Sequence, residues 1–324
     1  MNFAWTKEQH AFAETLDALL SSAGPVAAAR SWALGASDPG LALWRALADV
    51  GVQALCVPER LGGLDAGPVE AAIAFEKLGY HGVPGPWIES VVMAPALLAG
   101  TSEETLLAQV AAGETLVSFA APPMTPRAVD AAGARVFFLA EGGALHRGVT
   151  GPLAASVDPS RRLSEVTPGA PVATVSSDRL ARAFDGAALA CAAVLLGAGE
   201  RLLATSVDYV GERRQFGRPV GQFQAVKHLL ADVRVALDFA RPLVLGAAHQ
   251  LAAGSSDAGR DVSAAKVACA DAAHLAARTA LQVHGAIAYT IECDVSLWLL
   301  KVRALMAAWG TAGFHRDRLI RALI

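Results

Sequence analysis

Apolar residues recur at steps of three and four along most of the chain, which predicts a mainly helical protein. Four long segments near the C-terminus carry this period and are joined by short connections, which favours an antiparallel four-helix bundle. They cover residues 185–211, 221–253, 258–284 and 294–323. Shorter helices are predicted at the N-terminal end, over 5–20, 41–52, 69–80 and within 88–111. Pro242 falls inside the second long helix, where it removes a backbone donor and predicts a kink.

The hydrophobic period changes in the middle of the chain. Short runs rich in Val, Phe and Thr, cut by Gly and Pro, occupy residues 117–122, 135–149 and 171–177. They predict a small β unit, with a hairpin turn at Gly142 and Gly143. The expected fold is mainly α with a small β domain. It comprises an N-terminal helical domain (1–112), a reduced β domain (113–180) and a C-terminal four-helix bundle (181–324).

Composition excludes several function classes. Hydrophobic residues make up 54% and charged residues 18% of the 324, and the net charge of −3 gives no electrostatic reason to bind nucleic acid or an anionic membrane. The longest apolar stretch, 186–199, is shorter than the roughly 20 residues of a membrane span and is interpreted as a buried helix. The N-terminus lacks the apolar core of a signal peptide, and the four cysteines show no CxxC spacing. We therefore expect a cytoplasmic protein without disulfides.

Common catalytic signatures are missing from the sequence. There is no GxSxG, no Walker loop, no HExxH and no GxGxxG after a strand. The eight histidines have no ligand spacing, so no metal site is predicted. Glu14, Glu70 and Glu76 lie on amphipathic segments and are interpreted as solvated positions.

The stretch ERRQFGRPVGQFQAVKHLLAD at 212–232 concentrates unusual chemistry. Arg213 and Arg214 end one predicted helix, and a turn follows before the next helix begins. Arginine binds phosphate oxygens through two parallel hydrogen bonds, and a helix start adds backbone donors. Gln215 could donate further hydrogen bonds, and Phe216 is predicted to hold the loop against the core. The residues alone leave open a second interpretation, a solvated basic turn.

RRQFGRPVGQFQAVKHLLADV closely resembles the signature of the acyl-CoA dehydrogenase family. These flavin enzymes introduce a double bond α,β to a CoA thioester. LWRALADVGVQALCVPERLGGL resembles the family's N-terminal helical domain, LQVHGAIAYTIECD its glycine turn, and WGT at 309–311 its motif near the chain end. The resemblance covers essentially the whole chain and implies the helix–β–helix order that periodicity predicts.

The resemblance implies that the arginine loop crosses a dimer interface and holds FAD bound to the neighbouring subunit. Carried over by position, Arg213 would bind the diphosphate, with Gln215 and Phe216 beside it. Gln282 and Gly285 would lie near the neighbour's adenosine.

The departures from the family pattern concern catalysis. The family's base is usually a glutamate directly before Gly-Thr, and Trp309 stands there, whose indole can only donate. In another branch the base lies at the position of Ala253. No catalytic residue is therefore assigned. APPMTPRAVDAAG at 121–133 replaces the stretch that contacts the flavin ring, and the glycine turn reads Gly-Ala-Ile-Ala at 285–288.

Three hypotheses follow. In the first, the chain is a degenerate subunit of a heteromeric FAD-dependent acyl-CoA dehydrogenase. A homologous full-length partner in an α2β2 assembly, as in bacterial steroid catabolism, would supply the base and the flavin-ring surface. The substrate would be an acyl-CoA, steroid-derived by resemblance alone, and electrons would leave to an electron-transfer flavoprotein. The second is a self-sufficient homo-oligomer with a displaced base, for which Glu292, Asp294 and Glu212 are the nearest carboxylates. The third is a flavin-free scaffold or binding protein.

Overall fold

A computed structural model describes residues 4–130 and 133–324. The N-terminal part is helical, as predicted. Its elements are α1 (Lys7–Ser22), α2 (Pro25–Ala33), α3 (Asp38–Asp49), η1 (Glu59–Leu61), α4 (Pro68–His81), η2 (Glu89–Met93), α5 (Ala94–Leu98) and α6 (Leu106–Ala111). A reciprocal capping box fixes the start of α1, because Thr6 accepts from the Gln9 backbone while the Gln9 side chain accepts from the Thr6 backbone.

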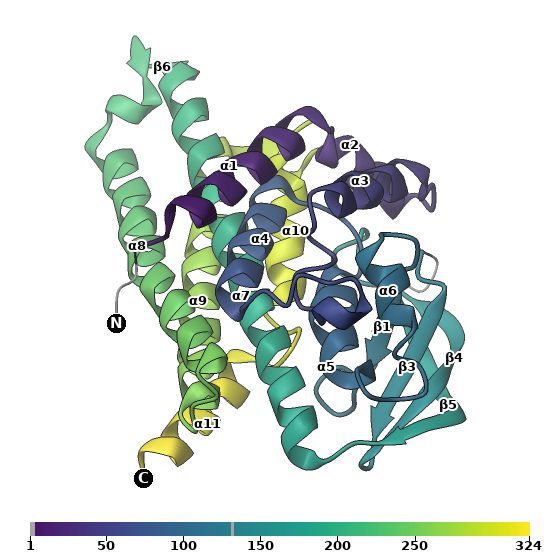
Figure 1. The fold of residues 1–324 in the computed structure, drawn as a ribbon. Helices are drawn as coiled ribbons and strands as arrows, with labels where there is room; N and C mark the ends of the chain where they lie inside the picture. The colour runs from purple at the N-terminus through teal and green to yellow at the C-terminus, as the bar shows by residue number, and fades with distance from the viewer. Residues whose placement is uncertain (1–3, 131–132) are drawn as a thin grey trace.

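A small mixed sheet follows in the chain (Figure 1). It contains β1 (Val117–Ala120), β2 (Ala128–Val129), β3 (Val136–Glu141), β4 (Ala144–Ala154) and β5 (Leu163–Thr174), in the order β1-β3-β4-β5-β2. β1 and β3 are parallel, and the other pairs are antiparallel. The predicted hairpin is confirmed: Gly142 (φ 59°) and Gly143 (φ 79°) form the two-residue turn between β3 and β4.

Long helices form the C-terminal part (Figure 1). They are α7 (Ser177–Glu212), α8 (Gln224–Ala252), α9 (Ala258–His284), α10 (Val295–Leu305) and α11 (Ala312–Leu323), with short elements β6 (Arg214–Gln215), β7 (Arg218–Pro219), η3 (Val220–Gln222) and η4 (Gly285–Tyr289) between them. The prediction of one helix over 294–323 was wrong. Trp309 and Gly310 have φ values of 55° and 95°, outside the helical region, and the Thr311 hydroxyl accepts from the Phe314 backbone to start a new helix.

Helix α7 is the centre of the molecule and packs directly on α4. The crossing is so close that a Cβ on Gly79 would lie 2.1 Å from the Val194 carbonyl oxygen, and one on Gly197 would lie 1.9 Å from that of Glu76. Helix α7 is long and apolar enough to cross a membrane, but 78% of its most apolar window is buried inside the protein, as in a core helix.

Ion pairs also join α8 to α4 and α7. Arg241 contacts Glu76 at 2.7 Å and Glu200 at 2.8 Å, and Arg234 contacts Glu200 at 2.7 Å. The interpretation of Glu76 as a solvated position was therefore wrong, because its carboxylate neutralises a guanidinium from a helix about 165 residues away. Glu70 accepts a hydrogen bond from Gln9, whereas Glu14 is exposed as expected.

Candidate functional site

The arginine loop is a short hairpin at the end of the long helices α7 and α8 (Figure 1). The Arg213 backbone N–H donates to the Tyr209 carbonyl at 2.9 Å, and its carbonyl accepts from the Val220 N–H at 2.8 Å. Phe216 (φ 50°) and Gly217 (φ 79°) then form the two-residue turn of β6 and β7. Both residues have positive φ, which is the requirement of a type I′ turn.

The side chains of this hairpin extend into solvent. Phe216 is 90% exposed, so the prediction that it holds the loop against the core was wrong. Its ring meets Phe223 edge-on at 6.2 Å, and the Arg218 guanidinium lies 4.2 Å from the Phe223 centroid. The hairpin is thus stabilised by its own residues. Within the part of the chain that the structure describes, the exposed Arg213 guanidinium has no hydrogen-bond or ion-pair partner.

The second set of predicted site residues lies at the same end of the bundle. His284, the last residue of α9, stacks on Tyr209 with ring centroids 4.3 Å apart, one turn before Arg213. Gln282 and Gly285 beside it are exposed, and a Cβ on Gly285 would meet no atom within 4 Å. The structure therefore brings Arg213, Gln282 and Gly285 to one end of the molecule.

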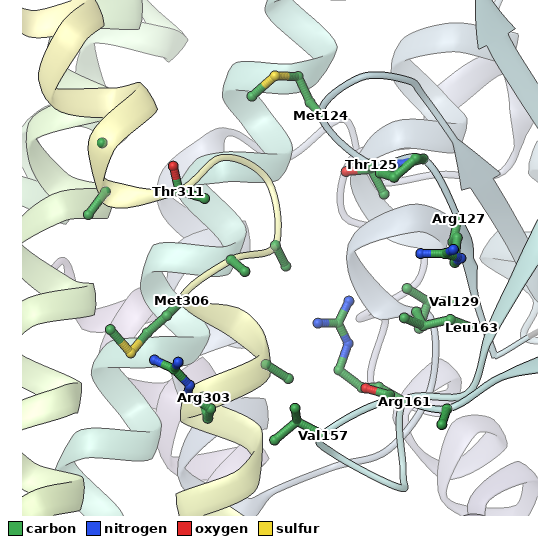
Figure 2. A pocket seen from close by; sticks show the side chains of 18 residues that line it. Met124, Thr125, Arg127, Val129, Val157, Arg161, Leu163, Arg303, Met306 and Thr311 are labelled. Carbon is green, nitrogen blue, oxygen red and sulfur yellow. The ribbon is translucent and has the colours of Figure 1, made fainter.

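A separate cavity of about 700 Å³ lies between the sheet and the C-terminal helices (Figure 2). Residues 124–129 and 155–163 form one wall, and residues 303–313 form the other. Three arginines contribute to it: Arg127, Arg161 and Arg303. No Asp or Glu is found among the described residues that line it.

Sequence reasoning missed these arginines. Arg161 begins a second arginine doublet, Arg161-Arg162, which follows a proline and a serine in the β unit. That doublet was the available signal, but its position in a cavity depends on α10, which lies more than 130 residues further along the chain.

The family's usual base positions contain no carboxylate here. Trp309 is fully buried with its ring beside that of Phe184, and its carbonyl accepts a hydrogen bond from His315 at 2.9 Å. Ala253 is the C-cap of α8. The displaced candidates, Glu292, Asp294 and Glu212, are exposed and lie outside the cavity lining, and Asp294 pairs with Arg30 at 2.7 Å.

Buried carboxyls do lie behind the cavity, but little space surrounds them. Glu89 is 2% exposed and Asp130 fully buried, and burial raises the pKa of both, that of Asp130 to about 7. The Trp32 indole donates to Asp130 at 2.7 Å. The space beside Glu89 is only about 40 Å³, narrowed by Trp87 and Leu305, and leaves room for about one water.

Along the chain, helical segments precede and follow a small mixed sheet, and an exposed arginine hairpin joins two long helices, which is the order of elements in the acyl-CoA dehydrogenase fold. The family models for the acyl-CoA dehydrogenase N-terminal and C-terminal domains match residues 6–114 and 178–324. The chain belongs to the acyl-CoA dehydrogenase family.

Among curated relatives, the chain is 34% identical over 299 residues to acyl-CoA dehydrogenase IpdE2 of Mycobacterium tuberculosis, covering 90% of each chain. It is 28% identical to acyl-CoA dehydrogenase FadE27 of the same organism, covering 87% of each. The fold matches one chain in the structure of the ChsE4-ChsE5 complex from Mycobacterium tuberculosis with a TM-score of 0.86 and 24% identity, covering 100% of this chain and 99% of that chain. It also matches a variant of the Tcur3481-Tcur3483 steroid ACAD with a TM-score of 0.87 and 22% identity, covering 98% of each.

Proposed function

We propose that this chain is the non-catalytic subunit of a heteromeric FAD-dependent acyl-CoA dehydrogenase, which donates its arginine hairpin to a flavin site of the partner. The main support for this proposal is that the hairpin lies far from the cavity between the sheet and the C-terminal helices. The hairpin extends from the free ends of α7 and α8, away from the sheet that borders the cavity (Figure 1). An FAD whose diphosphate is held by Arg213 would therefore not reach this chain's own cavity, and its flavin ring would lie on another polypeptide.

The hairpin residues fit a diphosphate. Among the described residues, Arg213 has no acidic partner, and its backbone is fixed by hydrogen bonds on both sides, so its side chain projects from a rigid backbone. Helix α8 begins beside it without a side-chain cap, which leaves backbone donors for oxygen atoms. Gln215 and Phe216 would flank the diphosphate, and Gln282 and Gly285 would face the adenosine.

The rest of the chemistry is assigned to the partner. FAD, when bound, supplies the hydride acceptor for α,β-desaturation of an acyl-CoA. Removal of the α-proton needs a carboxylate within hydrogen-bond reach, and none lines this chain's cavity among the described residues. We therefore assign the base to a homologous full-length subunit in an α2β2 assembly, with an electron-transfer flavoprotein as acceptor.

The names of similar structures support this assignment. One is called the ChsE4-ChsE5 complex, and another is called a steroid ACAD. A steroid-derived CoA thioester is accordingly the substrate that we propose for the assembly, which we place in the cytoplasm.

The test is to express the chain alone and together with a full-length acyl-CoA dehydrogenase homologue from the same genome, and to record the flavin absorbance of each purified protein. We expect flavin only in the complex. In the complex, Arg213→Ala should weaken FAD binding about tenfold to a hundredfold, since a hydrogen bond to a charged group contributes about 1.5–3 kcal/mol.

The neighbouring arginine provides a matched control. The Arg214 guanidinium turns back to the Gly217 carbonyl at 3.5 Å, so Arg214→Ala should leave FAD occupancy nearly unchanged. A flavin-containing, active lone chain would contradict the subunit role. Full FAD occupancy in the Arg213→Ala complex would instead contradict the role of the hairpin.

A further inference from the structure

The cavity between the sheet and α10–α11 combines positive charge with apolar walls. Figure 2 shows the Arg161 side chain extending from one wall into the open space, with Arg127 above it on the same side. Arg303 lies at the edge formed by α10. Met124, Val157 and Met306 give the cavity its apolar surface.

The arginine side chains of this cavity have few direct acidic partners within the described structure. The guanidinium groups of Arg161 and Arg303 make no ion pair or hydrogen bond among the described residues, and Arg127 meets Glu165 only at 3.6 Å between two exposed side chains. Three acids lie behind Arg161, and the positive charge of Arg161 lowers the pKa of each of them. Asp158 is paired with the buried Lys301 at 3.2 Å, and burial shifts Asp130 and Glu89 toward their neutral forms.

The loop that forms the upper wall uses its own backbone groups. The Ala121 N–H donates to the Thr125 carbonyl at 2.7 Å, and the Thr125 N–H donates to the Ala121 carbonyl at 2.9 Å. These backbone groups bond to each other and are therefore not free to bind the edge of a flavin ring. The Thr125 hydroxyl, in contrast, is buried without a hydrogen-bond partner and could donate to a ligand.

We propose that this cavity is a binding site for an organic oxyanion, a carboxylate or phosphate ester carried on an apolar body, with Arg161 as its central anion-binding group. Arg127 would close over the charged group, and the methionine and valine side chains would cover the apolar part. The inference rests on the proposed function, because it requires that the flavin ring lie on the partner and not in this cavity.

The site is tested in the assembled complex with two fluorescent probes that share one aromatic body. 8-Anilinonaphthalene-1-sulfonate carries an anionic group, and N-phenyl-1-naphthylamine lacks it. We expect Arg161→Gln to weaken binding of the sulfonate probe at least tenfold and to leave binding of the neutral probe within twofold. Competition with octanoate and with octyl phosphate then identifies the preferred oxyanion.

Two further variants keep the result interpretable. Arg127→Gln alters an exposed residue at the cavity, so it should fold normally and weaken the sulfonate probe in the same direction. Arg45→Ala, an exposed arginine outside the cavity, should change nothing. Equal sulfonate binding by wild type, Arg161→Gln and Arg127→Gln would overturn this inference alone. If the isolated chain takes up FAD, and FAD displaces the sulfonate probe in an Arg161-dependent way, the subunit role fails as well.

Discussion

At the scale of single residues, two aromatic residues adopt a left-handed backbone conformation that is unfavourable for a bulky side chain. Phe216 has φ 50°, a left-handed conformation that a bulky residue adopts at some cost, and it is also 90% exposed. Trp309 has φ 55° and is fully buried. In Phe216 the unfavourable geometry presents a ring to solvent, where a partner or cofactor could cover it. In Trp309 it turns the residue away from the cavity and into the core.

Trp309 shows why restoring the family's usual residue should not restore the reaction. Trp309→Glu would place a carboxylate in a fully buried position beside the apolar Phe184 ring, and the smaller side chain would leave part of the indole volume empty. We expect the free energy of unfolding to fall by about 3–5 kcal/mol and no dehydrogenase activity to appear in the lone chain. Urea denaturation and an acyl-CoA oxidation assay measure both. Trp309→Phe, which keeps an apolar ring, should cost less. Activity gained by the glutamate variant would contradict the observed direction of this side chain.

His315 predicts an acid sensitivity. Burial lowers its pKa to about 4 from an ordinary value of 6.5, against the opposing effect of its hydrogen bond to Trp309, and Lys266 and Arg318 lower it further. The folded state therefore holds the neutral ring while the unfolded state binds a proton. His315 should contribute stability that is complete above pH 6.5 and is lost progressively toward pH 4, by about 3 kcal/mol.

The measurement compares urea denaturation of wild type and His315→Gln between pH 7 and pH 4. The variant should show a smaller loss of stability with acid, whatever its stability at pH 7. His228→Gln, at an exposed position on α8, is the control and should follow the wild type. Parallel pH profiles for wild type and His315→Gln would show that His315 does not titrate in this way.

At the scale of elements, the crossing of α4 and α7 decides how the N-terminal helices attach to the bundle. The two glycines let the backbones touch, and the Arg241–Glu76 pair joins α4 to α8 beside this crossing. Periodicity predicted the helices, but not this contact, because a glycine within a helical pattern does not identify its neighbour.

Gly197→Ala should therefore destabilise the protein, although alanine has a higher helix propensity than glycine. Alanine usually stabilises a helix by about 1 kcal/mol relative to glycine. Here its Cβ would lie 1.9 Å from the Glu76 carbonyl, so we expect a loss of about 2–3 kcal/mol as the helices move apart. Gly211→Ala in the same helix meets no atom within 4 Å and should instead be neutral or stabilising. Thermal denaturation of the two variants gives the comparison, and a stable Gly197→Ala protein would mean that the crossing is looser than the structure indicates.

At the scale of the whole molecule, the sequence predicted the mainly helical architecture with a small β unit and the hairpin at Gly142. It failed where long-range contacts decide the outcome. The break at Trp309 and Gly310 follows no loss of periodicity, and it is held by His315 from the following helix. Phe216 was expected inside because apolar side chains usually are, whereas its position is determined by the type I′ turn. Arg161 enters a cavity only when the sheet and α10 have come together.

The exposed β6–β7 tip also has a consequence for the life of the chain in a cell. Loop tips of this kind are preferred sites of proteolytic cleavage, and this one joins two long helices. In the proposed assembly the tip would be buried against cofactor and neighbour, whereas a copy without a partner would keep it uncovered. The amount of this chain would then be limited by the supply of its partner, and surplus copies would be removed by degradation without a dedicated regulator.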